Sequence, residues 1–294
     1  MLKKTILLLL SIGLLLAACA PAPQSEGPLH FTDGLGRELS LKGPAQRVVS
    51  LAPSNTEILF AVGAGAQTIG RDEFSDYPAE AKALPSVGGS MGQYSTEAIL
   101  ALKPDLVLAA EINAPELVKQ LEDLGITVYY LKNPKTLEEM YKNLQIVASL
   151  TGHDATPLVE SLQTRVKKVD EKILPLSSRV SVFYEIDGTD PAKPYTYGPG
   201  SFGDLLIERA GGYNIAHNLS DPYPQMSLEQ IVKANPSFIL LGDSNWGTTA
   251  KQVKARPGWA SIYAVQSGQI LPLDDNLISR PGPRLVDGLE QLAE

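Results

Sequence analysis

Short apolar runs alternate along the chain with segments in which apolar residues recur every three or four positions. Short runs are typical of buried strands, and the three-to-four spacing is typical of amphipathic helices. The predicted strands cover residues 47–52, 106–110, 127–131, 180–184 and 238–241. The predicted helices cover residues 55–62, 95–102, 115–124, 203–210, 228–234 and 285–293. This alternation of strands and helices predicts an α/β fold built on parallel sheets.

Residues that favour helix capping stand before three of the predicted helices. Ser54 precedes the helix at 55–62 and is a possible N-cap. Thr136 opens a further helix, and Glu139 follows three residues later, which is the spacing of a capping box. Thr156 can cap the long helix described next, and Pro157 suits its first position.

The segment TPLVESLQTRVKKVDEKIL predicts one long helix in the middle of the chain. Its apolar residues recur at steps of three and four, at Leu158, Leu162, Val166, Val169 and Ile173. A helix of roughly 18 residues is about 27 Å long. We therefore expect a stiff connector rather than a flexible linker.

One stretch of the sequence occurs twice. STEAILALKPDLVLAA at residues 95–110 aligns without gaps with SLEQIVKANPSFILLG at residues 227–242, 132 positions later. Solenoid repeats are only roughly 20 to 50 residues long, so this interval indicates two similar domains. A chain of 294 residues is also long enough for two. We predict two parallel-sheet α/β lobes, residues 45–153 and 176–294, joined by one long rigid helix at 154–175.

The N-terminal residues have the pattern of an export signal. Residues 1–18 combine two lysines, an apolar run and a small-residue end, as in a secretory signal peptide. Cys19, the only cysteine, directly follows Leu-Ala-Ala as in a bacterial lipobox, so we expect it to be acylated. More than one acyl chain would give stable anchoring. Residues 20–28, rich in Pro, Ser and Gly, predict a flexible tether within an N-terminal extension that ends near residue 44.

Composition and charge narrow the range of partners. The apolar content of 44% and the charged content of 20% are ordinary for a globular protein. Removal of residues 1–18 takes away two lysines and changes the net charge from −8 to −10. Such an acidic surface argues against nucleic acid and for a body held away from an anionic membrane. We therefore predict a tethered, extracytoplasmic protein.

The glycine-rich segment GPGSFG resembles two functional motifs that its context excludes. Gly198, Gly200 and Gly203 have the spacing of a dinucleotide-binding motif, but they follow a proline-broken loop instead of a strand. A serine-hydrolase elbow is excluded because Pro199 stands where its first glycine belongs. The remaining interpretation is a loop that leads into the N-terminus of a helix, where backbone N–H groups can donate hydrogen bonds to a ligand. The loop APSNTE at residues 52–57 has the same character in the first lobe.

The histidines do not form a recognisable metal motif. His30, His153 and His217 are scattered, without the paired spacing of a zinc or manganese site, and we expect all three at the surface. Only His217, Tyr195 or Tyr197 could reach a haem iron, if haem were the ligand.

The motifs together resemble those of one known family. RVVSLAPSNTEILFAVGAG, SDYP and TEAILALKPDLVLA in the first lobe are similar to segments of the helical-backbone substrate-binding proteins of ABC importers. YGPGSFGDLLIERAGGYNIA, DPYPQMSLEQIVKANPSFIL and SRPGPR follow in the same order in the second lobe. These proteins capture vitamin B12, ferric siderophores or haem, and SDYP and YPQMSLEQ resemble the cobalamin-binding branch most. The resemblance covers nearly all of the mature chain.

The resemblance implies a ligand cleft between the lobes and an importer as partner. The importer is a permease dimer with its ATPase subunits, and the binding protein is a monomer without catalysis. In this family a glutamate on the rim of each lobe engages arginines of the permease, and these roles fall on Glu97 and Glu229. The alternative is that each glutamate only complements its own helix dipole, worth about 0.3 to 1 kcal/mol. Their matching positions in the repeat favour docking.

The resemblance also assigns ligand residues. A large, flat, partly apolar ligand such as a corrinoid needs aromatic walls and a few orienting polar groups. By motif match the aromatic walls fall on Phe74, Tyr195 and Tyr223, and residues 274–276 correspond to a stretch that contacts the ligand's amide groups. The alternative for each aromatic is packing in a turn or the core. The candidate ligand residues are Ser54, Asn55, Phe74, Tyr94, Tyr195, Tyr197, Gly200, Ser201, Tyr223, Asp275, Asn276 and Arg280.

The chain departs from the cobalamin-binding branch at two positions. That branch often has tryptophans after VGG and after DLVLA, where this chain has Ser-Met at 90–91 and Ala-Glu at 110–111. Tyr94 could substitute for one of them. The two tryptophans of this chain, Trp246 and Trp259, lie elsewhere in the sequence.

These observations predict a lipid-anchored binding protein that carries cobalamin or a related corrinoid to an ABC importer. A ferric siderophore or haem is the alternative ligand within the family. Outside the family, a secreted esterase or a structural lipoprotein is the alternative. The esterase would need a Ser-His-acid motif, which is not recognisable here, and the structural lipoprotein would need a broad apolar patch.

Overall fold

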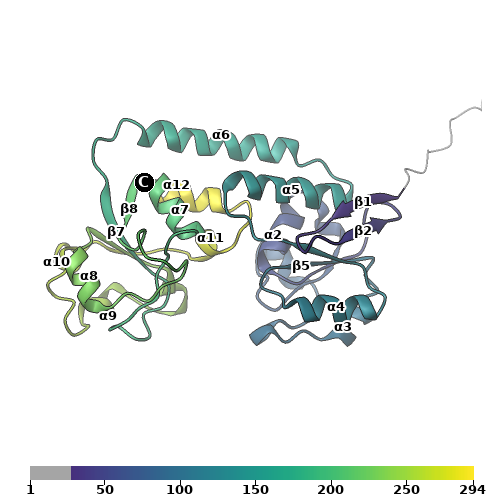
Figure 1. Ribbon diagram of the computed structural model, residues 1–294, viewed down its shortest axis with the longest axis horizontal. Coiled ribbons are helices and arrows are strands. Elements are labelled where there is room, and N and C mark those ends of the chain that lie inside the picture. Colours follow the sequence, from purple (N-terminus) through teal and green to yellow (C-terminus); the bar gives the residue numbers. More distant parts are fainter. Residues whose placement is uncertain (1–27) are drawn as a thin grey trace, which may run out of the picture.

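Two lobes lie side by side, and one long helix, α6 (Thr156–Ile173), spans the space between them along one side (Figure 1). The computed structural model describes residues 28–294. The predicted signal peptide at residues 1–18, the expected lipidation site Cys19 and all of the predicted tether except Pro28 lie outside the described residues. Within the described part of the chain, no helix has the length and apolar character needed to cross a bilayer.

The N-terminal lobe contains a parallel sheet with the strand order β4-β3-β5-β6. Its strands are β3 (Val48–Ser50), β4 (Thr68–Gly70), β5 (Leu106–Ala110) and β6 (Val128–Leu131). Its helices are α2 (Pro53–Ala61), α3 (Thr96–Ala101), α4 (Pro115–Asp123) and α5 (Leu137–Thr151). Its 3-10 turns are η1 (Ala64–Gln67), η2 (Ala79–Ala83) and η3 (Ser90–Gly92).

Helices cover both faces of this sheet. Leu106 and Leu108 of β5 pack with α2 and α5, whereas Val107 and Ala109 pack with α3 and α4. Because both faces are covered, every residue of β5 is buried. This explains why the strand reads as a continuous apolar run rather than as an alternating pattern.

The C-terminal lobe repeats this topology with the strand order β10-β9-β7-β8. Its strands are β7 (Val180–Glu185), β8 (Gly212–Asn214), β9 (Phe238–Leu241) and β10 (Ile270–Pro272). Its helices are α7 (Phe202–Arg209), α8 (Leu228–Ala234), α9 (Ala250–Lys254), α10 (Tyr263–Ser267), α11 (Asn276–Ser279) and α12 (Leu285–Leu292), and its 3-10 turn is η4 (Gly242–Trp246). The predicted fold of two parallel-sheet α/β lobes is confirmed.

The repeated stretch has the same structure in both lobes. Each copy forms a short helix, α3 or α8, followed by a strand at the same place in its sheet, β5 or β9. Between helix and strand, Lys103 and Asn235 occupy matching positions and both have a positive φ, 49° and 47°. This conformation is uncommon for residues other than glycine, so its recurrence shows that the repeat extends to the detailed backbone.

Helix α6 is held along both lobes rather than standing free. Its buried residues belong to a hydrophobic cluster that contains residues of both sheets, among them Leu106 and Tyr184. Arg165 of α6 pairs with Asp287 and Glu290 of α12, and further along α6 a second ion pair links the helix to α7. The connector is therefore fixed to its neighbours, as a stiff helix requires.

Residues 29–41 form a hairpin that the sequence pattern did not predict. Strands β1 (Leu29–Thr32) and β2 (Glu38–Leu41) pair antiparallel. The buried carboxylate of Asp33 in the turn accepts hydrogen bonds from the N–H groups of Leu35 and Arg37, from the Arg37 side chain and from the N–H of Tyr130. Gly34 donates back to the carbonyl of Tyr130 at 2.8 Å, so the hairpin is joined to β6.

Two of the three capping predictions were wrong. Helix α2 begins at Pro53 after Ala52, and Ser54 is buried within its first turn instead of capping it. Helix α6 begins at Thr156 itself, whose N–H donates to the side chain of Asp154. In both cases a proline in the first turn needs no partner for its nitrogen, which removes part of the need for a cap. The hydroxyl of Thr136 does cap α5, but the predicted capping box is incomplete, because the carboxylate of Glu139 accepts from the N–H of Lys135 instead of that of Thr136.

Candidate functional site

Each sheet has a topological switch point, which is the place where the chain leaves two adjacent strands toward opposite sides. In the N-terminal lobe these strands are β3 and β5, and in the C-terminal lobe they are β7 and β9. Ligands of open parallel sheets bind in the crevice at the carboxyl ends of such strands. The segments that follow these ends are residues 51–55 and 111–114 in one lobe and 186–188 and 242–246 in the other.

Both lobes have exposed aromatic side chains near this region. Phe74 is 49% exposed and Tyr223 is 57% exposed. The pKa of the Tyr223 phenol is raised by partial burial and by the negative charges of Asp275 and Glu111, and Glu111 belongs to the opposite lobe. On the other side, Arg280 of the C-terminal lobe donates to the carbonyl of Phe74 at 3.3 Å. The backbone of Phe74 therefore lies at the boundary between the lobes, and Tyr223 lies within electrostatic range of the opposite lobe.

A group of tyrosines supports Tyr223 from within the C-terminal lobe. Tyr197 is buried and lies 6.0 Å from Tyr223 between ring centroids. Its hydroxyl and that of Tyr184 donate to the same oxygen of Asp275, at 2.9 and 2.8 Å. Burial and the charge of Asp275 raise the pKa of both phenols. The two neutral hydroxyls therefore hold Asp275 in place, and Tyr197 stands behind Tyr223 instead of lining the surface.

Asn276 follows Asp275 at the start of α11. Its side-chain amide donates to Asp274 at 2.9 Å, and its backbone N–H donates to the same oxygen at 3.1 Å. Both Asp275 and Asn276 remain partly exposed. This stretch therefore presents oriented carboxylate and amide groups at the carboxyl end of β10.

The predicted ligand residues Ser54, Asn55 and Tyr94 lie in or beside the buried polar interior of the N-terminal lobe. Ser54 and Asn55 are buried, and the Asn55 amide donates to the carbonyl of Leu108 at 3.0 Å. The Tyr94 hydroxyl donates to the carbonyl of Leu51 at 2.8 Å and accepts from Asn113. Partial burial and the charge of the nearby Asp72 raise the pKa of Tyr94 to about 12.

The loop before α7 combines one exposed tyrosine with a capped helix start. Tyr195 is 43% exposed and pairs as an isolated bridge with residues 187 and 225. Ser201 is buried, accepts from the N–H of Asp204 and donates to the carbonyl of Gly198, so its hydroxyl serves the helix. Gly200 has a φ of +85°, which an L-residue adopts rarely, and space around it is open.

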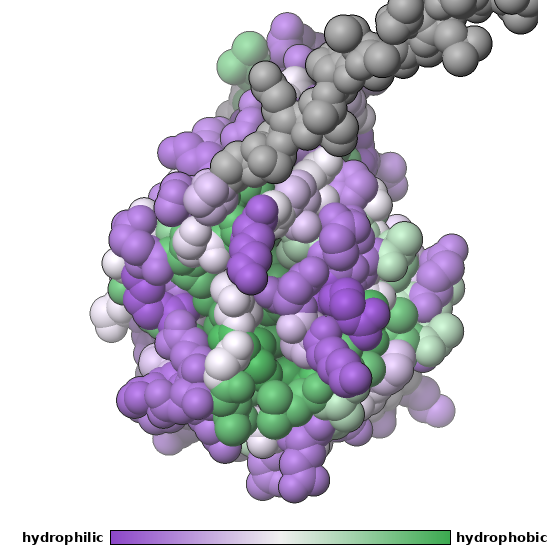
Figure 2. All heavy atoms as spheres, turned by 90° about the vertical axis from the view of Figure 1, so that its right-hand side faces the viewer, coloured by the Kyte–Doolittle hydropathy of each residue, from purple (hydrophilic) through white to green (hydrophobic). Residues whose placement is uncertain are grey.

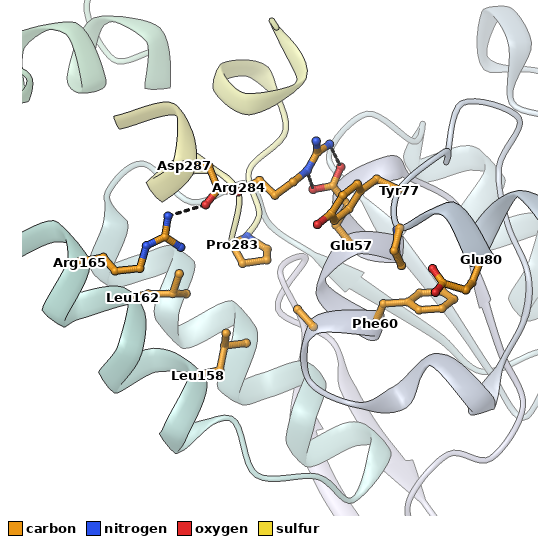
Figure 3. Close-up of a pocket in the computed structure, with 12 residues that line it drawn as sticks. Glu57, Phe60, Tyr77, Glu80, Leu158, Leu162, Arg165, Pro283, Arg284 and Asp287 are labelled. Atoms are coloured by element: carbon orange, nitrogen blue, oxygen red, sulfur yellow. Dashed lines mark hydrogen bonds and ion pairs between the residues drawn. The ribbon is translucent and has the colours of Figure 1, made fainter. Parts of the chain in front are cut away.

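Arg280 holds the two lobes together. Its guanidinium donates to Glu57 at 3.0 Å and to Asp76 at 2.7 Å, both in the N-terminal lobe. Arg284 donates to both oxygens of Glu57, and its guanidinium lies 4.1 Å above the ring of Tyr77 (Figure 3). Glu57 is buried and both arginines are largely buried. We call Glu57, Asp76, Arg280 and Arg284 the interlobe ion cluster.

A groove of about 580 Å³ lies beside the interlobe ion cluster, between α2, α6 and the segment 283–287 (Figure 3). Phe60, Leu158 and Leu162 contribute apolar walls, and its cations are already paired with Glu57 and the α12 acids. None of the predicted ligand residues lines this groove. We therefore place the candidate ligand site at the carboxyl ends of the strands, near the predicted ligand residues Tyr223 and Asp275.

Glu97 and Glu229 lie at matching positions on the surface. Each is exposed in the first turn of its helix, behind the capping residues Ser95 and Ser227. Helices α3 and α8 lie on the side of their lobes away from α6 (Figure 1). Within residues 28–294, neither carboxylate forms an ion pair.

Figure 2 views the N-terminal lobe end-on and shows a hydrophobic area on this mostly hydrophilic face. The area is low in the view, at the height of α3 and α4 in Figure 1.

His217 lies in a cluster with two acids. Its Nδ1 is 3.0 Å from Asp204, and one potential ligand atom each of Asp204, Glu208 and His217 lies within 4.8 Å of the others. The sequence spacing did not indicate this grouping. Glu208 also accepts from the N–H of Asn214 and pairs with Arg179, so its carboxylate is already satisfied by hydrogen bonds. His153 bonds Gln67, and His30 lies exposed on β1.

Three side chains in this region were absent from the sequence-based list of ligand residues. The charge of Glu111 acts on Tyr223 of the other lobe, Glu57 joins the interlobe ion cluster, and Trp246 ends η4 at the carboxyl end of β9. A weak signal existed for two of them just after the repeated stretch. Glu111 directly follows the predicted strand at 106–110, and Trp246 lies five residues after the predicted strand at 238–241. No local signal exists for the partners of Glu57, which are more than 200 residues away.

Comparisons with known proteins agree with this architecture. The family model described as periplasmic binding protein matches residues 48–277. An uncharacterized ABC transporter substrate-binding lipoprotein of Bacillus subtilis is 34% identical over 97% of this chain and 94% of its own. The solved periplasmic vitamin B12-binding protein of Vibrio cholerae is 30% identical with a TM-score of 0.69, covering 85% of this chain and 96% of its own. The periplasmic haem-binding protein of Roseiflexus is 27% identical with a TM-score of 0.75, covering 85% and 97%.

Proposed function

The chain belongs to the periplasmic binding protein family, and we propose that it binds cobalamin or a related corrinoid between its lobes and delivers it to an ABC importer. Its relatives are substrate-binding proteins of ABC importers, and they include vitamin B12-binding proteins. The observation that carries the choice of ligand is a pair of exposed aromatics in opposite lobes: Phe74, whose carbonyl accepts from Arg280, and Tyr223, which lies beside Tyr197. The proposed activity is binding, with no bond made or broken.

A corrinoid matches the chemistry of this region. Its flat ring is partly apolar and suits aromatic walls, and its rim carries amide groups that both donate and accept hydrogen bonds. Tyr195 and Tyr223 offer exposed rings in the C-terminal lobe. Asp275 and Asn276 offer an acceptor and an amide that the surrounding hydrogen bonds already orient. Preoriented groups lose little freedom on binding, which favours affinity.

Haem or a ferric siderophore is the second candidate ligand. Tyr195 is exposed, and a phenolate oxygen is a known ligand of ferric haem iron. His217 is less suited to that role because its ring nitrogen is bonded to Asp204. Haem-binding proteins are also among the structural relatives.

The ligand is tested by calorimetric titration of the mature protein with three separate probes: cyanocobalamin, haemin and a ferric hydroxamate siderophore. We expect cyanocobalamin to bind with a stoichiometry near one. Binding of haemin or the siderophore without any heat from cyanocobalamin would replace the corrinoid by the second candidate. Absence of binding to all three probes would refute the proposed function.

We further propose that Glu97 and Glu229 dock the protein on an importer permease dimer that works with ATPase subunits. The support is their exposure, their lack of an ion-pair partner among the described residues, and their equivalence in the two lobes. Two equivalent carboxylates fit two equivalent cationic sites of a dimer, so a monomeric binding protein is sufficient. Leu100, one turn from Glu97, is 39% exposed and adds apolar contact area.

Docking is separated from helix-dipole effects by a matched control. The double variant Glu97→Ala, Glu229→Ala should bind ligand normally and lose uptake, because removing one partner of a desolvated charge pair costs about 2 to 5 kcal/mol. Glu116→Ala is the control, since Glu116 is also an exposed acid in a first helical turn, that of α4. Normal uptake by the double variant would end the docking proposal. Equal loss of uptake in the control would assign the effect to helix stability.

The proposed location is the outer side of the membrane, with acylated Cys19 as the anchor. The support is the signal-like sequence of residues 1–18, the position of Cys19 after Leu-Ala-Ala, and a relative described as a lipoprotein. Cys19→Ala should shift the protein from the membrane fraction to the soluble extracytoplasmic fraction. Retention of this variant in the membrane fraction would contradict the anchor.

A further inference from the structure

Trp246 ends the η4 turn that directly follows β9, one of the two strands at the switch point of the C-terminal sheet. It is 84% exposed, which is unusual for the largest apolar side chain. The other tryptophan, Trp259, is fully buried, and its indole N–H donates to the carbonyl of Pro191 at 3.1 Å. The exposure of Trp246 therefore reflects its particular place in the fold.

The backbone under Trp246 is anchored on several sides. Asp243, which is buried, accepts from the N–H of Gly188 at 3.1 Å and from the hydroxyl of Thr248 at 2.9 Å. Ser244 donates to the carbonyl of Leu273 at 3.2 Å. An exposed ring on a backbone held in this way is a fixed platform, not the tip of a loose loop.

The same anchors place Trp246 beside the candidate ligand groups. The amide of Asn245 donates to Asp274 at 2.8 Å, and Asp274 also accepts from Asn276. Asp275, next in the chain, is the residue that Tyr184 and Tyr197 hold. The Trp246 turn and the stretch 274–276 are thus neighbouring parts of one surface at the carboxyl ends of β9 and β10, which pair in parallel.

We propose that Trp246 is a ligand-contacting residue whose indole packs against a flat, partly apolar ligand at the carboxyl end of the C-terminal sheet. This inference rests on the proposed function and extends it by one aromatic wall. The indole supplies a ring face for stacking and an N–H donor for a carbonyl or carboxylate on the ligand rim. Corrinoids and haem both have a flat ring with such acceptors at the rim.

Tyr263 provides a matched control on the same sheet. It is an exposed aromatic, but it lies on α10 near the amino end of β9, where the N–H of the next residue, Ala264, donates to Pro236. Trp246 lies at the opposite end of that strand. Either substitution to alanine removes one exposed aromatic ring from the surface, but only Trp246 lies at the end of the sheet where the ligand is proposed to bind.

The test compares Trp246→Ala, Trp246→Phe and Tyr263→Ala in calorimetric titrations, with cyanocobalamin as the probe. If the wild type binds haemin instead, haemin replaces it. We expect Trp246→Ala to weaken binding by roughly tenfold, which is about 1.4 kcal/mol. Trp246→Phe should recover most of the affinity, and Tyr263→Ala should bind as the wild type does. Melting temperatures should be unchanged because neither side chain supports the core.

A second measurement uses the contrast between the two tryptophans. Brief oxidation with excess N-bromosuccinimide, mapped by mass spectrometry, should modify Trp246 and spare Trp259, and bound ligand should protect Trp246. Equal oxidation of Trp246 with and without ligand, or binding by Trp246→Ala within twofold of the wild type, would overturn this inference and leave the proposed function intact. A much lower melting temperature of Trp246→Ala would overturn it in favour of a structural role. Failure of the wild type to bind any probe would refute the proposed function and this inference together.

Discussion

Replacement of Glu57 tests whether the interlobe ion cluster stabilises the fold. Glu57 is 2% exposed and accepts hydrogen bonds from Arg280 and Arg284, whose side chains are only 13% and 11% exposed. Glu57→Gln removes the negative charge between two largely buried cations and keeps the shape of the side chain. Loss of one partner of a buried ion pair costs about 3 to 5 kcal/mol, because a charge is left buried without compensation. For a chain of this size, that corresponds to a decrease in melting temperature of about 6 to 20 °C.

Asp76→Asn is the control for this prediction. Asp76 also pairs with Arg280, but its side chain is 49% exposed, and Arg280 keeps Glu57 when Asp76 is neutralised. Exposed pairs contribute about 0 to 1 kcal/mol, so this variant should unfold almost as the wild type does. Urea unfolding followed by circular dichroism gives both free energies. Equal stability of Glu57→Gln and Asp76→Asn would refute the reasoning.

Replacement of the ion pair by apolar residues gives a further check on the cause. In the double variant Glu57→Leu, Arg284→Met, no unpaired charge is left at position 284, and Arg280 retains Asp76. The double variant should therefore lose less stability than Glu57→Gln alone, although it carries more changes. A greater loss would show that packing, and not charge, determines the effect.

Other parts of the structure lead to further expected outcomes. Tyr195→Ala and Tyr223→Ala should each weaken ligand binding by about 1 to 3 kcal/mol with little change in melting temperature, whereas normal binding with a much lower melting temperature would place both rings in the core. Ligand should change the radius of gyration in X-ray scattering only slightly, because α6 and the interlobe ion cluster fix the lobes; a large decrease would contradict this. Burial raises the pKa of Asp33, but hydrogen bonds from Arg37 and Leu35 outweigh it, so the pKa lies below its ordinary value of 3.8. Asp33→Asn should therefore lower the free energy of unfolding by about 1 to 3 kcal/mol at pH 7, and this difference should fade as the pH falls below 3.8 through the folded-state pKa; a difference that stays constant with pH would argue against the charge of Asp33 as its cause.

The regular part of the fold could be predicted because its signals are local. Buried strands such as β5 and β9 are continuous apolar runs, and the two copies of the repeated stretch supported each other. The edge strands β4, β8 and β10 were missed because each has only three residues and one of these is a glycine or a proline, which are depleted in strands. Strand β3 is equally short, but it lies in the apolar segment 47–52. The hairpin β1–β2 was missed because its link to β6 depends on Asp33 and Tyr130, which are 97 residues apart.

The candidate site was predictable only for side chains that form no hydrogen bonds with other parts of the chain. Phe74, Tyr195 and Tyr223 are exposed, which contradicts the alternative of core packing, and their role as aromatic walls for the ligand stays a prediction. The hydroxyls of Ser201 and Tyr197 instead bond to the protein, which motif matching cannot reveal since it contains no hydrogen-bond partners. The place of an exposed side chain at a switch point depends on the strand order, which becomes known only when the sheet is seen.

The interlobe ion cluster also has a consequence for the order in which the protein is made. The partners of Glu57 follow it by 223 and 227 residues, so they leave the ribosome last. Until they arrive, the carboxylate of Glu57 in the middle of α2 lacks these two cations, and burying it alone is unfavourable. The packing of Glu57 against the C-terminal segment can therefore form only after nearly the whole chain has been synthesised. In a product that ends before Arg280, both arginines of the interlobe ion cluster are missing, so the carboxylate of Glu57 lacks both of its cations.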